Sequence, residues 1–214
     1  MESQSEKGDR LLPGKLISFT LNSSEKVASI FVNLKISPNT LSTLALLSGL
    51  GAGVLFACEQ PSWAVLLIII CGLFDILDGK VAKRTNRKSL FGAIYDSTLD
   101  RYSEFFIYLG LAVHFRFHWA IWIIFFTFLG ATMVSYTRAR AEGLGIECRI
   151  GIMQRAERMV LLSLGVIVGS IFKVFDPVII GVLLIIAVIS NITAFQRAFY
   201  VKKIENLRKQ EKEV

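Results

Sequence analysis

The chain has 214 residues, of which 53% are hydrophobic and 19% are charged, and its formal net charge is +7. Soluble domains carry about 25% charged residues, and the mean hydropathy here is +0.56, so the composition indicates an integral membrane protein without a large second domain. A basic excess in a membrane protein reports topology and contact with anionic headgroups, so no nucleic-acid partner is expected.

The N-terminal segment, residues 1–37, is predicted to be cytoplasmic and to contain an amphipathic helix that lies on the membrane surface. Apolar residues recur at helical spacing within Leu11–Leu34 and are mixed with Lys15 and Lys26, a pattern typical of interfacial helices. The preceding residues 1–10 are polar and lack the apolar core of a cleaved signal peptide.

Residues 38–200 are predicted to form one domain of six transmembrane helices, because apolar stretches close to the roughly 20 residues needed to cross a bilayer recur along them. The predicted spans are Leu41–Cys58, Trp63–Leu77, Phe91–Val113, Trp119–Tyr136, Met159–Phe175 and Val178–Phe195. Pro38 is expected to start the first helix, since proline is favoured in a first turn. The second stretch is short, and we expect its helix to continue past Asp78 and leave the membrane. Residues 201–214 are predicted to be a charged, helix-compatible cytoplasmic tail. The expected fold class is therefore all-α.

Basic residues predict the orientation of these spans. The short loops after the first, third and fifth spans carry only Arg116 and Lys173, whereas lysine and arginine gather after the second and fourth spans and in the two tails. The positive-inside rule therefore places both termini and the segments after spans two and four in the cytoplasm. We expect a multi-pass protein of the cell (plasma) membrane. No internal repeat is evident, which argues against an inverted-repeat transporter.

Four aspartates stand beside these apolar stretches, where carboxylates are costly and are by default functional. They are Asp75, Asp78, Asp96 and Asp100. The first two are spaced i,i+3 and the last two i,i+4, so each pair lies on one face of a helix. Two helices joined by a turn would bring the carboxylates together as oxygen ligands for hard divalent cations. The alternative is that the acids only pair with neighbouring cations such as Arg101 or Lys80.

The order of these residues resembles a family signature. The run Asp75-x-x-Asp78-Gly79-x-x-Ala82-Lys83, followed after eight residues by Gly92-x-x-x-Asp96-x-x-x-Asp100, is similar to that of the CDP-alcohol phosphotransferases, also called CDP-alcohol phosphatidyltransferases. The one departure is Lys83, where the family has arginine. Lysine keeps the charge but loses the forked geometry that grips phosphate, and the adjacent Arg84 is a possible substitute.

The resemblance implies six membrane helices with an N-terminal surface helix, a homodimer, and contact with membrane lipid. It implies transfer of a phosphatidyl group from a CDP-diacylglycerol-type donor to an acceptor hydroxyl, with release of CMP and the active site at the cytoplasmic face. It assigns the first three aspartates to two metal ions, usually Mg²⁺ with Mn²⁺ also possible. Asp100 is assigned as general base and further metal ligand.

The residues expected to bind the CDP-lipid are Pro38, Asn39, Thr40, Leu41, Gly79, Ala82, Lys83, Ser89 and Gly92. The first four follow from the resemblance alone. The two glycines would let two helices and a nucleotide approach closely, and the serine would hydrogen-bond a phosphate. Whether the donor's tails are ester- or ether-linked stays open.

Two further segments point to the acceptor. Ser135–Gly143 and Gln154–Arg158 resemble segments of prokaryotic phosphatidylinositol phosphate synthases and their archaeal counterparts. The resemblance implies a pocket of Arg138, Arg155 and Arg197 for the phosphate of inositol 1-phosphate, and three converging guanidinium groups suit a dianion. Other acceptors (glycerol 3-phosphate, serine or another alcohol) stay open, as does the alternative that these arginines only determine topology. A cation transporter using the acidic cluster is the alternative from a different class.

Overall fold

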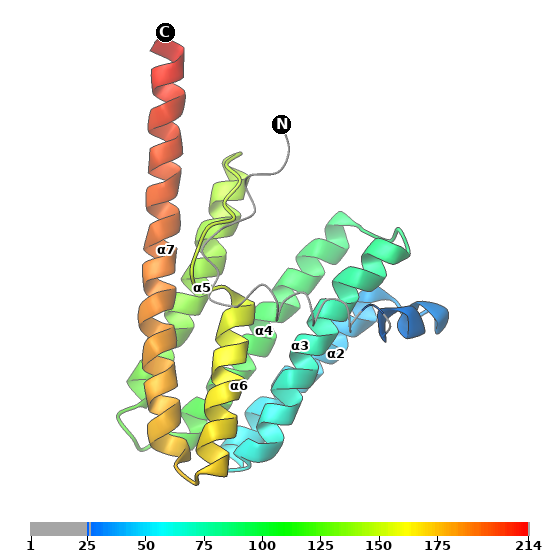
Figure 1. Ribbon diagram of the computed structural model, residues 1–214, viewed down its shortest axis with the longest axis vertical. Coiled ribbons are helices and arrows are strands. Elements are labelled where there is room, and N and C mark those ends of the chain that lie inside the picture. Colours follow the sequence, from blue (N-terminus) through cyan, green and yellow to red (C-terminus); the bar gives the residue numbers. More distant parts are fainter. Residues whose placement is uncertain (1–24, 26, 214) are drawn as a thin grey trace.

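The computed structural model describes residues 25 and 27–213, and throughout this part of the chain the regular structure is helical (Figure 1). Its long helices are α2 (Pro38–Ala57), α3 (Pro61–Arg84), α4 (Leu90–His114), α5 (Ile121–Gly143), α6 (Arg155–Ile171) and α7 (Phe175–Glu213). A short helical stretch at 27–33 precedes them. Each predicted apolar stretch corresponds to one long helix, so the all-α fold class is confirmed. Most ends agree within a few residues, but α3, α5 and α7 continue past the predicted Leu77, Tyr136 and Phe195 to Arg84, Gly143 and Glu213.

Three of these helices, α2, α5 and the apolar part of α7, are long and apolar enough to cross a membrane. The other three carry the charged residues of the candidate site: the aspartates on α3 and α4, and Arg155 and Arg158 on α6. The six-span arrangement therefore remains a prediction. Most of the predicted surface helix, Leu11–Leu34, lies outside the described residues.

Local sequence signals explain where the site helices begin and end. Ser37 caps α2 by accepting a 3.2 Å hydrogen bond from the Thr40 amide, and Pro38 occupies the first turn as predicted. The Ser89 hydroxyl caps α4 in the same way, at 2.9 Å from the Gly92 amide. Between α3 and α4 lies a short turn in which Asn86 adopts a positive φ of 52°. This turn places the two aspartate pairs on consecutive helices.

Glycines hold α2 directly against α4. A Cβ built on Gly110 would lie 2.1 Å from the carbonyl oxygen of Gly53, and a Cβ on Gly53 would lie 2.2 Å from that of Phe106. Such small-residue contacts let helix backbones approach closely in membrane proteins. Packing of α2 on both α3 and α4 holds its N-terminal end close to the aspartates of those helices.

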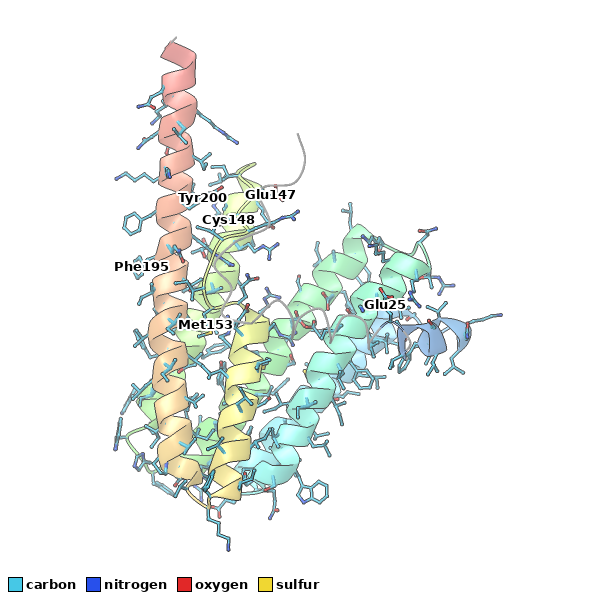
Figure 2. The ribbon with its side chains drawn as sticks, viewed as in Figure 1. Glu25, Glu147, Cys148, Met153, Phe195 and Tyr200 are labelled. Atoms are coloured by element: carbon cyan, nitrogen blue, oxygen red, sulfur yellow. The ribbon has the colours of Figure 1, made fainter. Side chains whose placement is uncertain are left out.

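The remaining helices form a second group in which α7 packs on α5 and α6, and contacts of α3 with α6 and of α4 with α5 join the two groups. Apolar side chains such as Ile107, Leu162 and Leu183 fill the core between them. Large apolar side chains also cover the outside, as Phe195 does on the outer side of α7 (Figure 2). The α3–α4 turn, the α5–α6 loop and the C-terminus lie at one end of the molecule (Figure 1).

Candidate active site

The first three aspartates of the signature meet at this end of the helices. One carboxylate oxygen from each of Asp75, Asp78 and Asp96 lies within 4.8 Å of the other two. The predicted meeting of acids from two consecutive helices is therefore confirmed for these three. Mg²⁺ and Mn²⁺ prefer carboxylate oxygens at about 2 Å, and the residues present fit such an ion.

Asp100, one turn further along α4, faces an arginine from α6. The Arg155 Nη1 atom lies 2.9 Å from Asp100 Oδ1 and 2.8 Å from Asp75 Oδ2, so one nitrogen bridges the two carboxylates. Its Nη2 atom donates to the Ser103 hydroxyl at 3.0 Å. Arg155 was expected beside the acceptor's phosphate; in the structure it neutralises the edge of the acidic cluster.

A serine on α2 completes the surroundings of the acids. The Ser42 hydroxyl donates a 2.6 Å hydrogen bond to Asp78 Oδ2, and the Asp78 residue is only 5% exposed. Sequence reasoning missed Ser42. No local pattern links it to Asp78, because the two are 36 residues apart and meet only through the packing of α2.

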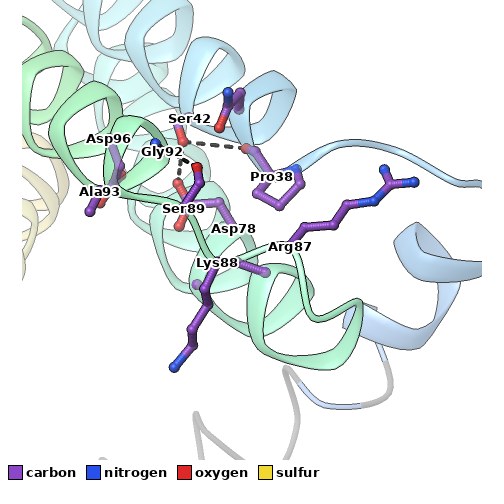
Figure 3. Close-up of a pocket in the computed structure, with 12 residues that line it drawn as sticks. Pro38, Ser42, Asp78, Arg87, Lys88, Ser89, Gly92, Ala93 and Asp96 are labelled. Carbon is purple, nitrogen blue, oxygen red and sulfur yellow. Dashed lines mark hydrogen bonds between the residues drawn. The ribbon is translucent and has the colours of Figure 1, made fainter.

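A cavity of about 260 Å³ opens beside these residues, between α2 and the α3–α4 turn (Figure 3). Its lining residues are Pro38, Asn39, Ser42, Asp78, Gly79, Ala82, Arg87, Lys88, Ser89, Gly92, Ala93 and Asp96. Six of the predicted donor residues are among them. A Cβ on Gly79 would meet nothing within 4 Å, so no neighbouring protein atom requires glycine there. The space that this glycine leaves open belongs to the cavity.

The other predicted donor residues lie elsewhere. Thr40 borders a second depression with Thr43 and Tyr95, whereas Leu41 is fully buried in the core between α2 and α3. Lys83 is exposed and lines neither cavity of the described chain. Arg84, the proposed substitute for it, contacts the Ser29 hydroxyl and so points toward the segment before α2.

Arg87 and Lys88 are cavity residues that the sequence suggested only as topology determinants. They lie in the turn within the signature's eight-residue gap, and their side chains extend in opposite directions (Figure 3). Basic residues inside that gap were a usable signal, since a diphosphate bound nearby would require positive charge.

The other two predicted acceptor residues have partners within the protein. The exposed Arg138 on α5 pairs with Glu142 at 2.9 Å. The buried Arg197 on α7 donates to the backbone carbonyl of Ile150 at 2.8 Å and to that of Val134. Arg197 thus anchors the α5–α6 loop onto α7, and the three predicted arginines each hold a different set of partners.

A second ion pair lies one turn deeper between α4 and α6. Arg158 is fully buried, and its Nε and Nη2 atoms lie 2.7 and 2.8 Å from the two carboxylate oxygens of Glu104. Glu104 was missed, although a carboxylate inside a predicted span is itself a signal. Glu104 follows Asp100 by four residues and Arg158 follows Arg155 by three. The Arg155–Asp100 and Arg158–Glu104 ion pairs therefore lie one helical turn apart between the same faces of α4 and α6.

Comparisons with known proteins agree with this geometry. Residues 35–195 match the CDP-alcohol phosphatidyltransferase family. The archaetidylinositol phosphate synthase of Pyrococcus horikoshii is 34% identical over 180 residues, which cover 84% of this chain and 90% of the relative.

Solved structures of a similar protein share the fold. The phosphatidylinositol phosphate synthase of Mycobacterium tuberculosis with CDP-DAG bound is 26% identical, with a TM-score of 0.75 over 83% of this chain and 92% of that one. Its complex with manganese and citrate gives a TM-score of 0.76 at 26% identity, over 83% and 88% of the two chains.

Proposed function

This chain belongs to the CDP-alcohol phosphatidyltransferase family, and from that premise we propose that it is a membrane enzyme of phospholipid biosynthesis. It transfers a phosphatidyl group from CDP-diacylglycerol, or a related CDP-lipid, to a hydroxyl of inositol 1-phosphate and releases CMP. The observation that carries this proposal is the meeting of Asp75, Asp78 and Asp96 beside a cavity that Asp78, Asp96 and Gly79 line.

The cavity is the proposed seat of the donor's cytidine diphosphate. Ser89 and the backbone near Gly92 would hydrogen-bond phosphate oxygens, while Arg87 and Lys88 raise the local positive charge. The absence of a side chain at Gly79 leaves room for the nucleotide. These features support the six predicted donor residues that line the cavity; Thr40 and Lys83 lie outside it, and Leu41 contributes only through packing.

Asp75, Asp78 and Asp96 are the proposed ligands of divalent cations, with two Mg²⁺ ions expected from the family resemblance. Such cations, when bound, neutralise the diphosphate and the charge that develops on the departing CMP. Asp100 is the proposed general base and a further ligand. Its carboxylate accepts the proton of the acceptor hydroxyl as the oxygen forms its bond to phosphorus and the bond to CMP breaks.

The proposal also names the acceptor alcohol. Inositol 1-phosphate is supported by the 34% identity to an archaetidylinositol phosphate synthase. Arg138, Arg155 and Arg197 stay the residues proposed for its phosphate, although in the structure each is held by partners within the protein. We further propose a homodimer with six spans in the cell membrane and the active site on the cytoplasmic side. The gathering of the basic α3–α4 turn, the α5–α6 loop and the C-terminus at one end supports that topology.

The test is CMP release by the purified protein with Mg²⁺ across a matched panel of acceptors. Inositol 1-phosphate, inositol, glycerol 3-phosphate and serine are each supplied with the same CDP-diacylglycerol, and the first is repeated with an ether-linked CDP-lipid. We expect turnover with inositol 1-phosphate and little with inositol. Turnover confined to non-phosphorylated alcohols would overturn the arginine pocket, and no CMP release with any acceptor would overturn the enzyme itself.

A further inference from the structure

The acidic cluster has two unequal halves. The oxygens of Asp75, Asp78 and Asp96 face one another within 4.8 Å. In contrast, the space between Asp75 and Asp100 is already held by a positive charge, because Arg155 Nη1 lies 2.8 Å from one carboxylate and 2.9 Å from the other. A nitrogen that bridges two carboxylates in this way stands where a cation shared by them would stand.

We propose that Arg155 is the resident counter-ion of this half of the site, so that a second divalent cation binds between Asp75 and Asp100 only when the Arg155 side chain leaves. The inference rests on the proposed function for the presence of two cations. The two ions are therefore expected to bind with different affinities, the weaker one in competition with Arg155.

The position of Arg155 in the fold is suited to a movement of its side chain alone. Arg155 is the first residue of α6, directly after the irregular α5–α6 loop, and its side chain is 16% exposed. Its Nε atom is buried without a hydrogen-bond partner in the described structure, so part of its bonding capacity is unused. One turn further along, the buried Arg158–Glu104 pair fixes α6 against α4. We therefore expect a displacement of Arg155 to be confined to its own side chain.

The displacement would have a consequence for binding order. While Arg155 bridges the two carboxylates, its guanidinium is not free for a phosphate. Once a cation takes over both carboxylates, the same guanidinium becomes available to an anionic acceptor at the start of α6. The observed position of Arg155 beside the aspartates is thus compatible with its predicted role beside the acceptor's phosphate.

The test is a Mn²⁺ titration followed by electron paramagnetic resonance on the detergent-solubilised protein, without donor or acceptor. Arg155→Met is expected to tighten the weaker class of Mn²⁺ sites about tenfold and to leave the tighter class nearly unchanged. Arg101→Met is the matched control. It removes the same charge near Asp100, but from an exposed side chain at 3.7 Å, and its expected effect is below about twofold.

A second variant loosens Arg155 without removing its charge. Ser103→Ala deletes the 3.0 Å partner of Nη2 and is expected to tighten the weaker class about threefold. This variant still tests whether Arg155 competes with the second cation if Arg155→Met does not fold.

Equal Mn²⁺ affinities in the wild type, Arg155→Met and Ser103→Ala would overturn the inference. An increase in Mn²⁺ affinity in Arg101→Met equal to that in Arg155→Met would also overturn it, because it would show a general effect of charge. Absence of any Mn²⁺ binding by the folded wild type would instead count against the proposed function.

Discussion

The Ser42 hydroxyl on α2 and the Asp78 carboxylate on α3 are joined by a buried hydrogen bond of 2.6 Å. This bond gives a carboxylate that is proposed to bind a cation a fixed direction, which a carboxylate among like charges would not otherwise keep. It also makes α2, which carries no acid in the cluster, part of the site.

Ser42→Ala is expected to weaken Mn²⁺ binding to the three-aspartate group by about tenfold, because Asp78 loses its orienting donor. The fall in the free energy of unfolding should be about 1 kcal/mol. Mn²⁺ titration and thermal unfolding measure the two effects. Ser48→Ala is the matched control, since that hydroxyl donates only to the Leu44 carbonyl of its own helix. Equal Mn²⁺ affinities in both variants would refute the orienting role.

Asp100→Asn is expected to lower kcat by about a hundredfold or more, since an amide cannot accept the acceptor's proton. The protein should stay folded and retain the CDP-lipid, because Asp75, Asp78 and Asp96 are unchanged. CMP release and equilibrium binding of the donor measure these outcomes. Asp176→Asn, at the far end of the helices beside His114, should leave turnover unchanged. Near-normal activity of the Asp100 variant would remove it from the role of general base.

Gly79→Val is expected to raise the KM for the CDP-lipid by about tenfold while the protein folds normally. The added side chain is expected to enter the cavity, and its Cβ has no protein atom within 4 Å. Gly72→Val lies on the same helix, also in open space but away from the cavity, and serves as the control. Initial rates measured against donor concentration give the KM of each variant. A KM that moves equally in both variants would contradict the placement of the nucleotide.

Gly110→Ala is expected to lower the free energy of unfolding by about 3 kcal/mol, in the range for overpacked cores, because its Cβ would lie 2.1 Å from the Gly53 carbonyl oxygen. Gly181→Ala has open space around its Cβ and should be neutral or slightly stabilising, by about 0.5 kcal/mol. Thermal unfolding in detergent compares them. Equal melting temperatures would mean that α2 and α4 can separate without cost.

The local features of this protein follow from short-range rules. The i,i+3 and i,i+4 spacings of the aspartates placed each pair on one helix face, and Pro38 marked the start of α2 because its ring suits a first turn. The helix predicted to pass beyond Asp78 does so, since α3 ends at Arg84. Such features depend on neighbours within about one turn, which is why the sequence alone predicts them.

The missed contacts depend on how helices are rotated and packed against each other. Ser42 meets Asp78 only because α2 packs directly against α3. Arg155 meets two carboxylates only because the start of α6 lies beside Asp75 of α3 and Asp100 of α4. A basic residue near a phosphate-binding signature suggests a phosphate ligand, but the spacing of residues along one helix carries no information about the facing helix. The position of Arg155 therefore had to come from the structure.

The length of α7 has a practical consequence. Its 39 residues extend about 58 Å at 1.5 Å per residue, whereas a bilayer's hydrocarbon core is about 30 Å thick. The surplus continues as an uninterrupted rod past the other helices, steadied where Arg208 donates to the Gly145 carbonyl at 3.2 Å. A compact soluble protein fused at Glu213 through a continuous helix would thus have a fixed orientation relative to the transmembrane helices. That would give this small enzyme a rigid fiducial for single-particle imaging.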